Sequence, residues 1–219
     1  MDVWGSFELD LSGSRTLGGS ASDRDLSAGS LARTWAEIST RVGRNDLPAL
    51  LVNTVGMGLL SDPVELRIGL ENTWTTCEWP GLAADRDLWV TLFDMAREPG
   101  TFLDETELRP ITELPETLCA YRAAAPGHEE GLSWTASFER AHWFAARLGG
   151  AAGGEHRIFE MDVPREWVLA SFRRTRGESE YIVDTTQNAG DAMREVLPEQ
   201  WQSLLAAPLD DEQAGPALD

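Results

Sequence analysis

The sequence predicts an α+β fold in which a helical region precedes a core of mixed strands and helices. Residues 31–109 carry apolar side chains at the three- and four-residue spacing of helix faces. After Pro110 the pattern changes to short alternating runs with one amphipathic helix between them, which is typical of α+β domains. With 219 residues, 42% of them hydrophobic, and nine tryptophans, the chain has enough apolar surface to form a compact core.

The N-terminal part of the chain divides into an arm and a helical region. The segment 1–30 is rich in Ser, Gly and Asp, a composition that supplies turns rather than core, and we expect a flexible arm. Residues 47–60 are expected to form a buried helical piece. A further helix is expected over 85–97, because acidic residues precede it and a Pro-Gly pair follows it. The first helix, in LARTWAEISTRV, has one apolar face formed by Leu31, Trp35, Ile38 and Val42.

The expected core spans residues 110–190, and an acidic tail follows over 191–219 with one amphipathic fragment at 201–205. We expect a helix over 137–148, ended by the glycine-rich loop 149–154. Alternation of apolar and polar residues predicts strands over 118–123, 131–135, 157–163 and 178–184, and residues 167–173 are expected to begin as a turn and end as a strand.

Charge and composition exclude several classes of function. The formal net charge is -19 and all 18 basic residues are arginine, so diffuse binding to nucleic acid or to anionic membranes is disfavoured. The same composition also fits a high-GC or salt-adapted host, in which an acidic surface maintains solubility. The two cysteines and three histidines show no metal-ligand or disulfide spacing, so no metal is expected. Because the sequence contains no signal peptide and no membrane-spanning segment, we expect a cytoplasmic protein.

Glu178 and Glu180 stand two residues apart in the last alternating run. Their side chains therefore leave the same strand face, about 6.6 Å apart. When carboxylates share a pocket their charge states can differ near neutral pH, and a fixed carboxylate stabilises an oxocarbenium-like transition state. The pair is suited to breaking a glycosidic bond. The alternative is a solvated edge strand with acidic decoration.

Arg122 and the triplet Ser133-Trp134-Thr135 are the other candidate site residues. Arg122 lies in an otherwise apolar strand, where a guanidinium needs an anionic partner. That partner is either an internal carboxylate or the diphosphate or ribose of a dinucleotide. Ser133 can hold a catalytic carboxylate in position, and Trp134 can cover a flat heterocycle. Alternatively, Thr135 caps the next helix and Trp134 belongs to the core.

The order and spacing of these residues resemble the Arg/Ser/Glu group of ADP-ribosyltransferases. In this family an arginine on the first core strand holds NAD, a Ser-x-Ser/Thr triplet begins the second strand, and a Glu-x-Glu pair carries catalysis. Tyr121-Arg122, the triplet and the run ERAHWFAARL resemble a bacterial and phage subgroup. The resemblance covers about residues 118–184 and implies an ADP-ribosyltransferase-like split β-sheet core. The bulky Trp134 departs from the family, in which this position is often small.

The resemblance implies roles for individual residues. Glu180 would be the catalytic glutamate, Glu178 would activate or orient the acceptor, and Ser133 would orient Glu180. NAD would be consumed as a substrate, and no metal would be needed. The residues expected to contact NAD are Arg122, Tyr121, Ser133, Trp134, Thr135 and Phe144.

The implied function is mono-ADP-ribosyl transfer: cleavage of the nicotinamide–ribose bond of NAD and transfer of ADP-ribose to a macromolecule. In relatives, a glutamate two residues before the catalytic one is associated with arginine acceptors, and the negative charge favours a protein over a nucleic acid. A toxin or phage-conflict effector is the implied setting, with a cognate antitoxin or inhibitor as a further partner and no membrane partner. Two alternatives stay open: an NAD glycohydrolase that uses the same pocket, and a non-catalytic acidic interaction or inhibitor protein.

Overall fold

The computed structural model describes residues 33–78, 80, 84–152, 156–172, 180–187 and 189–206, with the backbone alone for 150–152. All described residues belong to the second of the two units into which the chain divides, Ala32–Asp219. The expected arm over 1–30 and the candidate Glu178 lie outside the described residues.

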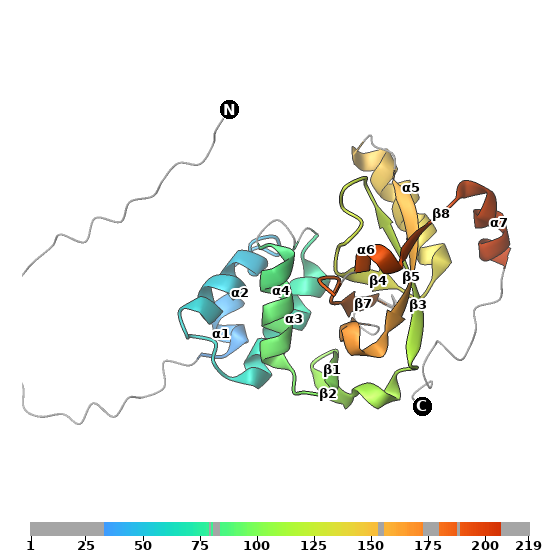
Figure 1. Cartoon of the computed structure of the whole chain (residues 1–219). Coiled ribbons are helices and arrows are strands. Elements are labelled where there is room, and N and C mark those ends of the chain that lie inside the picture. Colours follow the sequence, from blue (N-terminus) through green and yellow to red (C-terminus); the bar gives the residue numbers. More distant parts are fainter. Residues whose placement is uncertain are drawn as a thin grey trace, which may run out of the picture. The chain divides into compact units, whose positions relative to one another are not determined.

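Four helices, α1 to α4, precede the first strand in the described part of the chain, and further helices lie between and after the strands (Figure 1). Asp62 and Asp85 begin α3 and α4, because each carboxylate accepts a hydrogen bond from a backbone N–H of the first turn. A capping box formed by Thr34 and Glu37 begins α1, which is much shorter than the helix expected over 31–42. No sequence pattern predicted α3. The bounds are α1 (Trp35–Ser39), α2 (Leu47–Gly56), α3 (Pro63–Thr76) and α4 (Arg86–Ala96).

The strands form one mixed eight-stranded sheet in the described residues, with the order β2-β1-β6-β7-β4-β3-β5-β8. Neighbouring strands are antiparallel except β1 and β6, which are parallel. Together with the helices, the sheet confirms the predicted α+β class. The strands are β1 (Thr101–Asp104), β2 (Glu107–Pro110), β3 (Thr117–Ala124), β4 (Ser133–Thr135), β5 (Arg157–Pro164), β6 (Val168–Phe172), β7 (Glu180–Val183) and β8 (Met193–Val196).

The remaining helices are α5 (Phe138–Ala152), α6 (Ala189–Ala192) and α7 (Pro198–Ala206), with short 3-10 turns η2 (Ile111–Glu113) and η3 (Arg165–Trp167). The expectation that glycines at 149–154 end α5 is wrong by several residues, because a glycine inside a helix costs only about 1 kcal/mol. β8 and α7 lie within the segment expected to be a tail. None of the described helices combines the length and apolarity needed to cross a lipid bilayer.

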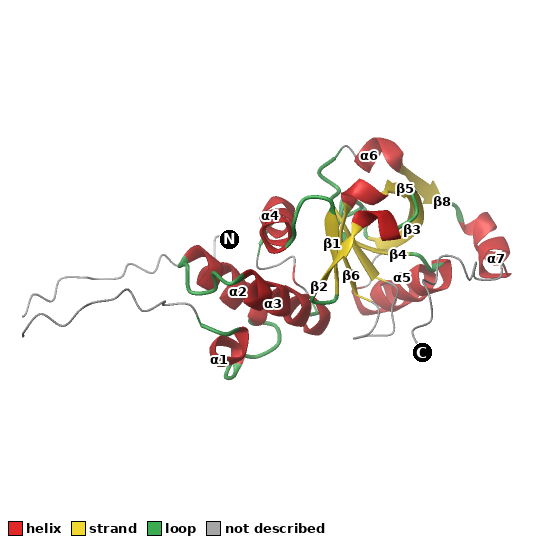
Figure 2. Ribbon diagram, turned by 90° about the horizontal axis from the view of Figure 1, so that it is seen from below, coloured by secondary structure: helices red, strands yellow, loops and turns green. Residues whose placement is uncertain are grey.

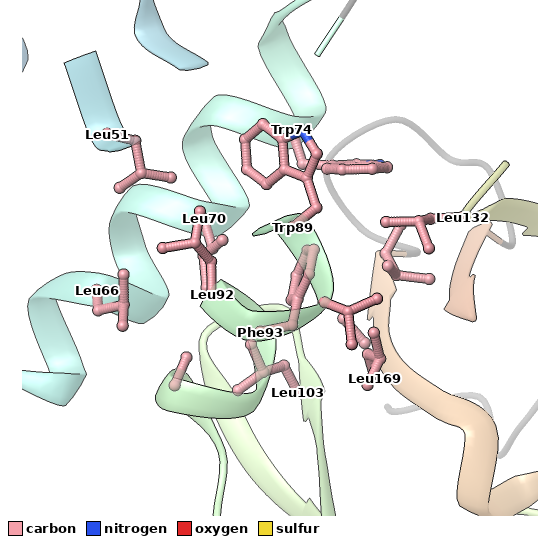
Figure 3. Close-up of a cluster of buried hydrophobic side chains, with 14 of the residues drawn as sticks. Leu51, Leu66, Leu70, Trp74, Trp89, Leu92, Phe93, Leu103, Leu132 and Leu169 are labelled. Atoms are coloured by element: carbon pink, nitrogen blue, oxygen red, sulfur yellow. The ribbon is translucent and has the colours of Figure 1, made fainter. Parts of the chain in front are cut away.

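The first helices and the sheet share one hydrophobic core (Figure 3). Trp74, Trp89 and Phe93 lie at its centre, against Leu103 and Leu169 from the sheet. Helix α3 packs closely on its neighbours at Gly69, where an added Cβ would stand 2.9 Å from Leu51 Cδ1. This packing fixes α3, and with it the side chains that α3 directs at the sheet.

A second core is formed by residues that alternate with those of the first. Along β1, Phe102 belongs to the second core and Leu103 to the first, and along β7 Tyr181 and Ile182 divide in the same way. Both faces of these strands are therefore buried. A third, smaller cluster lies where α5 packs against β3 and β5 (Figure 2). The candidate residues of β4 and β7 thus lie on strands held by buried neighbours.

Candidate functional site

Ser133 and Glu180 meet across the pairing of β4 with β7. Thr135 lies opposite Glu180 and Ser133 lies opposite Ile182. Because side chains two residues apart along a strand share a face, Ser133 lies diagonally across from Glu180. The Ser133 hydroxyl donates a hydrogen bond to Glu180 Oε1. The serine and one glutamate expected from the sequence are therefore brought into direct contact.

Trp74 of α3 contacts the same carboxylate, although it lies 106 residues earlier in the chain. Its indole Nε1 donates a hydrogen bond to Glu180 Oε1 at 3.1 Å. The sequence analysis missed Trp74, since a tryptophan in a helix of mixed composition carries no signal of a distant polar partner. Glu180 is only partly exposed, so both donors act in a partly desolvated setting.

Arg122, on β3, reaches toward the backbone of β4 and of the preceding loop. Its Nη1 donates to the Ser133 carbonyl at 2.7 Å and its Nη2 donates to the His128 carbonyl at 3.5 Å. Its Nε is buried and has no hydrogen-bond partner among the residues that the structure describes. Within the described residues, no carboxylate lies within 4.0 Å of the guanidinium, so the internal ion pair considered from the sequence is not formed there.

Burial lowers the pKa of Arg122 to about 10, and the nearby charges of Glu180 and then Glu129 oppose this lowering. The guanidinium is therefore a full cation at neutral pH. Its hydrogen bonds go to carbonyl oxygens, which carry no net charge. A half-buried cation without a bound counter-charge is an attractive site for an anionic group of a ligand.

Arg122 also lines an open pocket of about 300 Å³, together with Arg86, Gly127, His128, Glu130 and Gly131. The second arginine of this pocket is already engaged: Arg86 Nη1 lies 2.5 Å from Glu130 Oε2. Thr185 holds the same loop, because its hydroxyl donates to the Glu130 carbonyl at 2.6 Å. Among the described residues that line the pocket, Arg122 is therefore the arginine without an ion-pair partner, and it is available to an incoming anion.

No protein-family model, curated protein or solved structure matches this chain. What the site can do follows from its own groups. A carboxylate held by two donors can stabilise a developing positive charge, and the neighbouring cation can hold a phosphate. In the part of the chain that is described, no three His, Cys, Asp or Glu side chains are grouped as a metal site.

Two residues of the triplet have structural roles. Trp134 is 1% exposed, belongs to the second core and donates its indole N–H to the Gly131 carbonyl at 2.8 Å. A buried indole cannot cover a heterocycle, so the expectation that Trp134 lines an NAD pocket gives way to the core interpretation. Thr135 is also buried, and its hydroxyl accepts from the Ser137 backbone N–H at 3.2 Å. Ser137, rather than Thr135, caps α5 by accepting from the Arg140 N–H.

Two aromatic residues expected to contact NAD pack around α5. Tyr121 alternates with Arg122 along β3, and its ring meets Phe138 edge to face at 5.4 Å. Burial raises the pKa of the Tyr121 phenol above its usual range, so the side chain is neutral. Phe144 contacts Trp143 at 5.0 Å on α5. The structure thus gathers Ser133, Glu180 and Arg122, adds Trp74 and Gly131, and directs Tyr121 toward α5.

Proposed function

We propose that this protein is a mono-ADP-ribosyltransferase that consumes NAD, with Glu180 as its catalytic glutamate. The observation that carries the proposal is the hydrogen bond from Ser133 to Glu180 beside an arginine that has no carboxylate partner in the described residues. This is the arrangement that the Arg/Ser/Glu resemblance requires of its three residues. It is also opposite to a solvated acidic edge, in which Glu180 would point into water.

The fold-family assignment belongs to the same proposal. The arginine, the serine and the glutamate lie on β3, β4 and β7, in the chain order of the ADP-ribosyltransferase pattern. Among the described residues, β3 and β4 pair at Tyr121 and Thr135 alone, within one continuous sheet. This short pairing is the feature that supports a split core of the ADP-ribosyltransferase type in the proposal.

In the proposed reaction the bond between the nicotinamide nitrogen and ribose C1′ breaks, and nicotinamide leaves with the electron pair. Glu180 stabilises the positive charge that develops on the ribose. The acceptor nucleophile then forms a bond to C1′ and loses its proton. Glu178 lies outside the described residues and keeps the role that the resemblance gives it, which is to activate or orient the acceptor. In this proposal Glu178 is also the base that receives the acceptor's proton.

Arg122 holds the diphosphate or ribose of NAD in this proposal. A diphosphate supplies the anionic oxygens that the guanidinium lacks among its present partners, and a phosphate–arginine contact can use two nitrogens at once. The 300 Å³ pocket lined by Arg122 accommodates part of a dinucleotide rather than all of it.

A protein is favoured as the acceptor of ADP-ribose, because the net charge of -19 disfavours binding to a polyanion such as a nucleic acid. The effector setting follows from the resemblance.

The test is incubation of the purified protein with NAD labelled in its adenylate phosphate, in the presence of a cell lysate. The expected result is label in a macromolecular fraction that protease, and not nuclease, releases. Glu180→Gln is the matched negative control. Release of nicotinamide at the same rate without any acceptor would identify a glycohydrolase. Intact NAD and an unlabelled lysate would refute both enzymatic activities.

A further inference from the structure

We infer that Trp74 is a positioning residue for Glu180: the indole N–H, delivered by a helix outside the segment that carries the family resemblance, holds the carboxylate in its working orientation. The kinetic consequence of this inference depends on the proposed function, whereas the contact itself does not. The helical region before the sheet then forms part of the site instead of only covering the core.

The geometry around one oxygen supports the inference. Glu180 Oε1 accepts from Trp74 Nε1 at 3.1 Å and from the Ser133 hydroxyl. The two donors come from different elements, α3 and β4, so they fix the oxygen from separate directions. Hydrogen bonds to a charged acceptor are stronger than neutral ones and hold its orientation more tightly.

The position of the indole is itself fixed. Trp74 is 7% exposed, and its ring meets Trp89 edge to face at 5.3 Å and Phe93 at 5.6 Å (Figure 3). These neighbours leave the ring little rotational freedom, since edge-to-face contacts in a packed core hold a defined angle. The N–H is therefore preorganised toward the carboxylate.

The identity of the acceptor distinguishes the N–H of Trp74 from that of an ordinary buried indole. Packing requires the ring of Trp74, while its N–H requires an acceptor, and the acceptor found is the proposed catalytic group. Trp89 provides the contrast within the same cluster, because its Nε1 donates to the Pro80 carbonyl at 3.2 Å. Trp74 and Trp89 thus form a matched pair of buried indoles in contact with each other, and only Trp74 of the two donates its N–H to Glu180.

The first experiment compares Trp74→Phe with Trp89→Phe in the full chain, by the rate of nicotinamide release. Each change removes one indole N–H and leaves an aromatic ring. We expect Trp74→Phe to lower kcat about tenfold, as the loss of a hydrogen bond to a charged group implies, with KM for NAD changed less than about twofold. Trp89→Phe should leave kcat within about twofold of the wild type. Equal losses of kcat in the two variants would overturn the inference.

The second experiment does not require turnover. The indole N–H resonances are recorded by 15N–1H NMR, and the Trp74 resonance is the one missing in Trp74→Phe. Glu180→Gln replaces a charged acceptor with a neutral amide, so the Trp74 resonance should shift while the Trp89 resonance stays in place. If the chemical shift of the Trp74 resonance is unchanged in Glu180→Gln, the inference is overturned. If the wild type fails to consume NAD, the proposed function fails, and this shift still supports the positioning contact.

Discussion

The guanidinium of Arg122 lies directly against the Cα of Gly131. A Cβ on residue 131 would stand 2.0 Å from Arg122 Nη2 and 2.3 Å from Arg122 Cζ. The backbone of Gly131 is not in the left-handed region, unlike that of Gly127 in the same loop. Glycine is thus required at residue 131 for space rather than for conformation, and its absent side chain creates the place where the arginine lies.

Gly131→Ala should therefore displace Arg122 while the fold persists, because the clashing atoms are the end of a flexible side chain. We expect the Kd for NAD to rise about tenfold or more, the loss typical of a charged hydrogen-bonded contact. Isothermal titration measures this change. Gly56→Ala is the control, since a Cβ there meets nothing within 4 Å. Unchanged NAD affinity in Gly131→Ala would separate Arg122 from ligand binding.

Arg122→Met should make the protein more stable and unable to bind NAD. Burial lowers the pKa of Arg122 to about 10, so the charged guanidinium lowers the free energy of unfolding. Two hydrogen bonds to carbonyls offset much of that cost, and we expect a net gain of about 1 kcal/mol in the free energy of unfolding at pH 7. Urea denaturation followed by tryptophan fluorescence measures it.

The difference in the free energy of unfolding between Arg122→Met and the wild type should fall as pH rises above about 10. Below about pH 10 both folded and unfolded chains keep the arginine proton, so the gain from Arg122→Met is constant. As pH rises through 10, the folded wild type releases a proton that the unfolded chain still binds, and the wild type gains stability relative to the variant. A gain that grows above pH 10, or a variant less stable than the wild type at pH 7, would contradict the assigned cost of burial.

The strands that carry the site were predictable, because β3, β4 and β7 are short runs with clear alternation. Helix α3 could not be predicted from the sequence, because Gly69 and Thr73 occupy buried positions and break its apolar periodicity. The β1–β2 hairpin was missed for a related reason: its turn places Glu105 at a φ of 57°, where sequence patterns favour Gly or Asn.

The site residues also divide into those that could be predicted from the sequence and those that could not. Arg122, Ser133 and Glu180 were found because their residue types and order carry a chemical meaning. Trp74 and Gly131 were not, because a hydrogen bond across 106 residues and the space left by an absent Cβ arise only from packing. Trp134 was given a ligand role from its place beside Ser133, and its burial shows that alternation along β4 directs the ring into the core.

Alanine substitutions of Ser133 and Ser137 should affect different properties: the first should lower catalysis, and the second should lower stability. Ser133 donates to Glu180, so Ser133→Ala should lower kcat for nicotinamide release about tenfold and change stability by less than about 0.5 kcal/mol. Ser137 caps α5, so Ser137→Ala should lower the free energy of unfolding by about 1 kcal/mol and leave kcat unchanged. Kinetics and urea denaturation of both variants check the pair. The reverse assignment of effects would remove Ser133 from the site.

Glu180→Gln should abolish most turnover without unfolding the protein. The amide keeps the shape of the carboxylate but not its charge, so stabilisation of the cationic ribose is lost while packing is retained. We expect kcat for nicotinamide release to fall by about 10³-fold, a loss typical of a main electrostatic group, with the urea midpoint unchanged.

Glu160→Gln is the matched control for Glu180→Gln, because Glu160 is a partly exposed strand glutamate that accepts from Cys119 and lies on β5 rather than beside Ser133. It should leave kcat at the wild-type value. Comparable losses in both variants would point to a general effect of surface charge. Full activity in Glu180→Gln would leave the Ser133–Glu180 contact as a structural feature of the sheet, since a neutral amide cannot stabilise the developing charge that the proposed reaction requires.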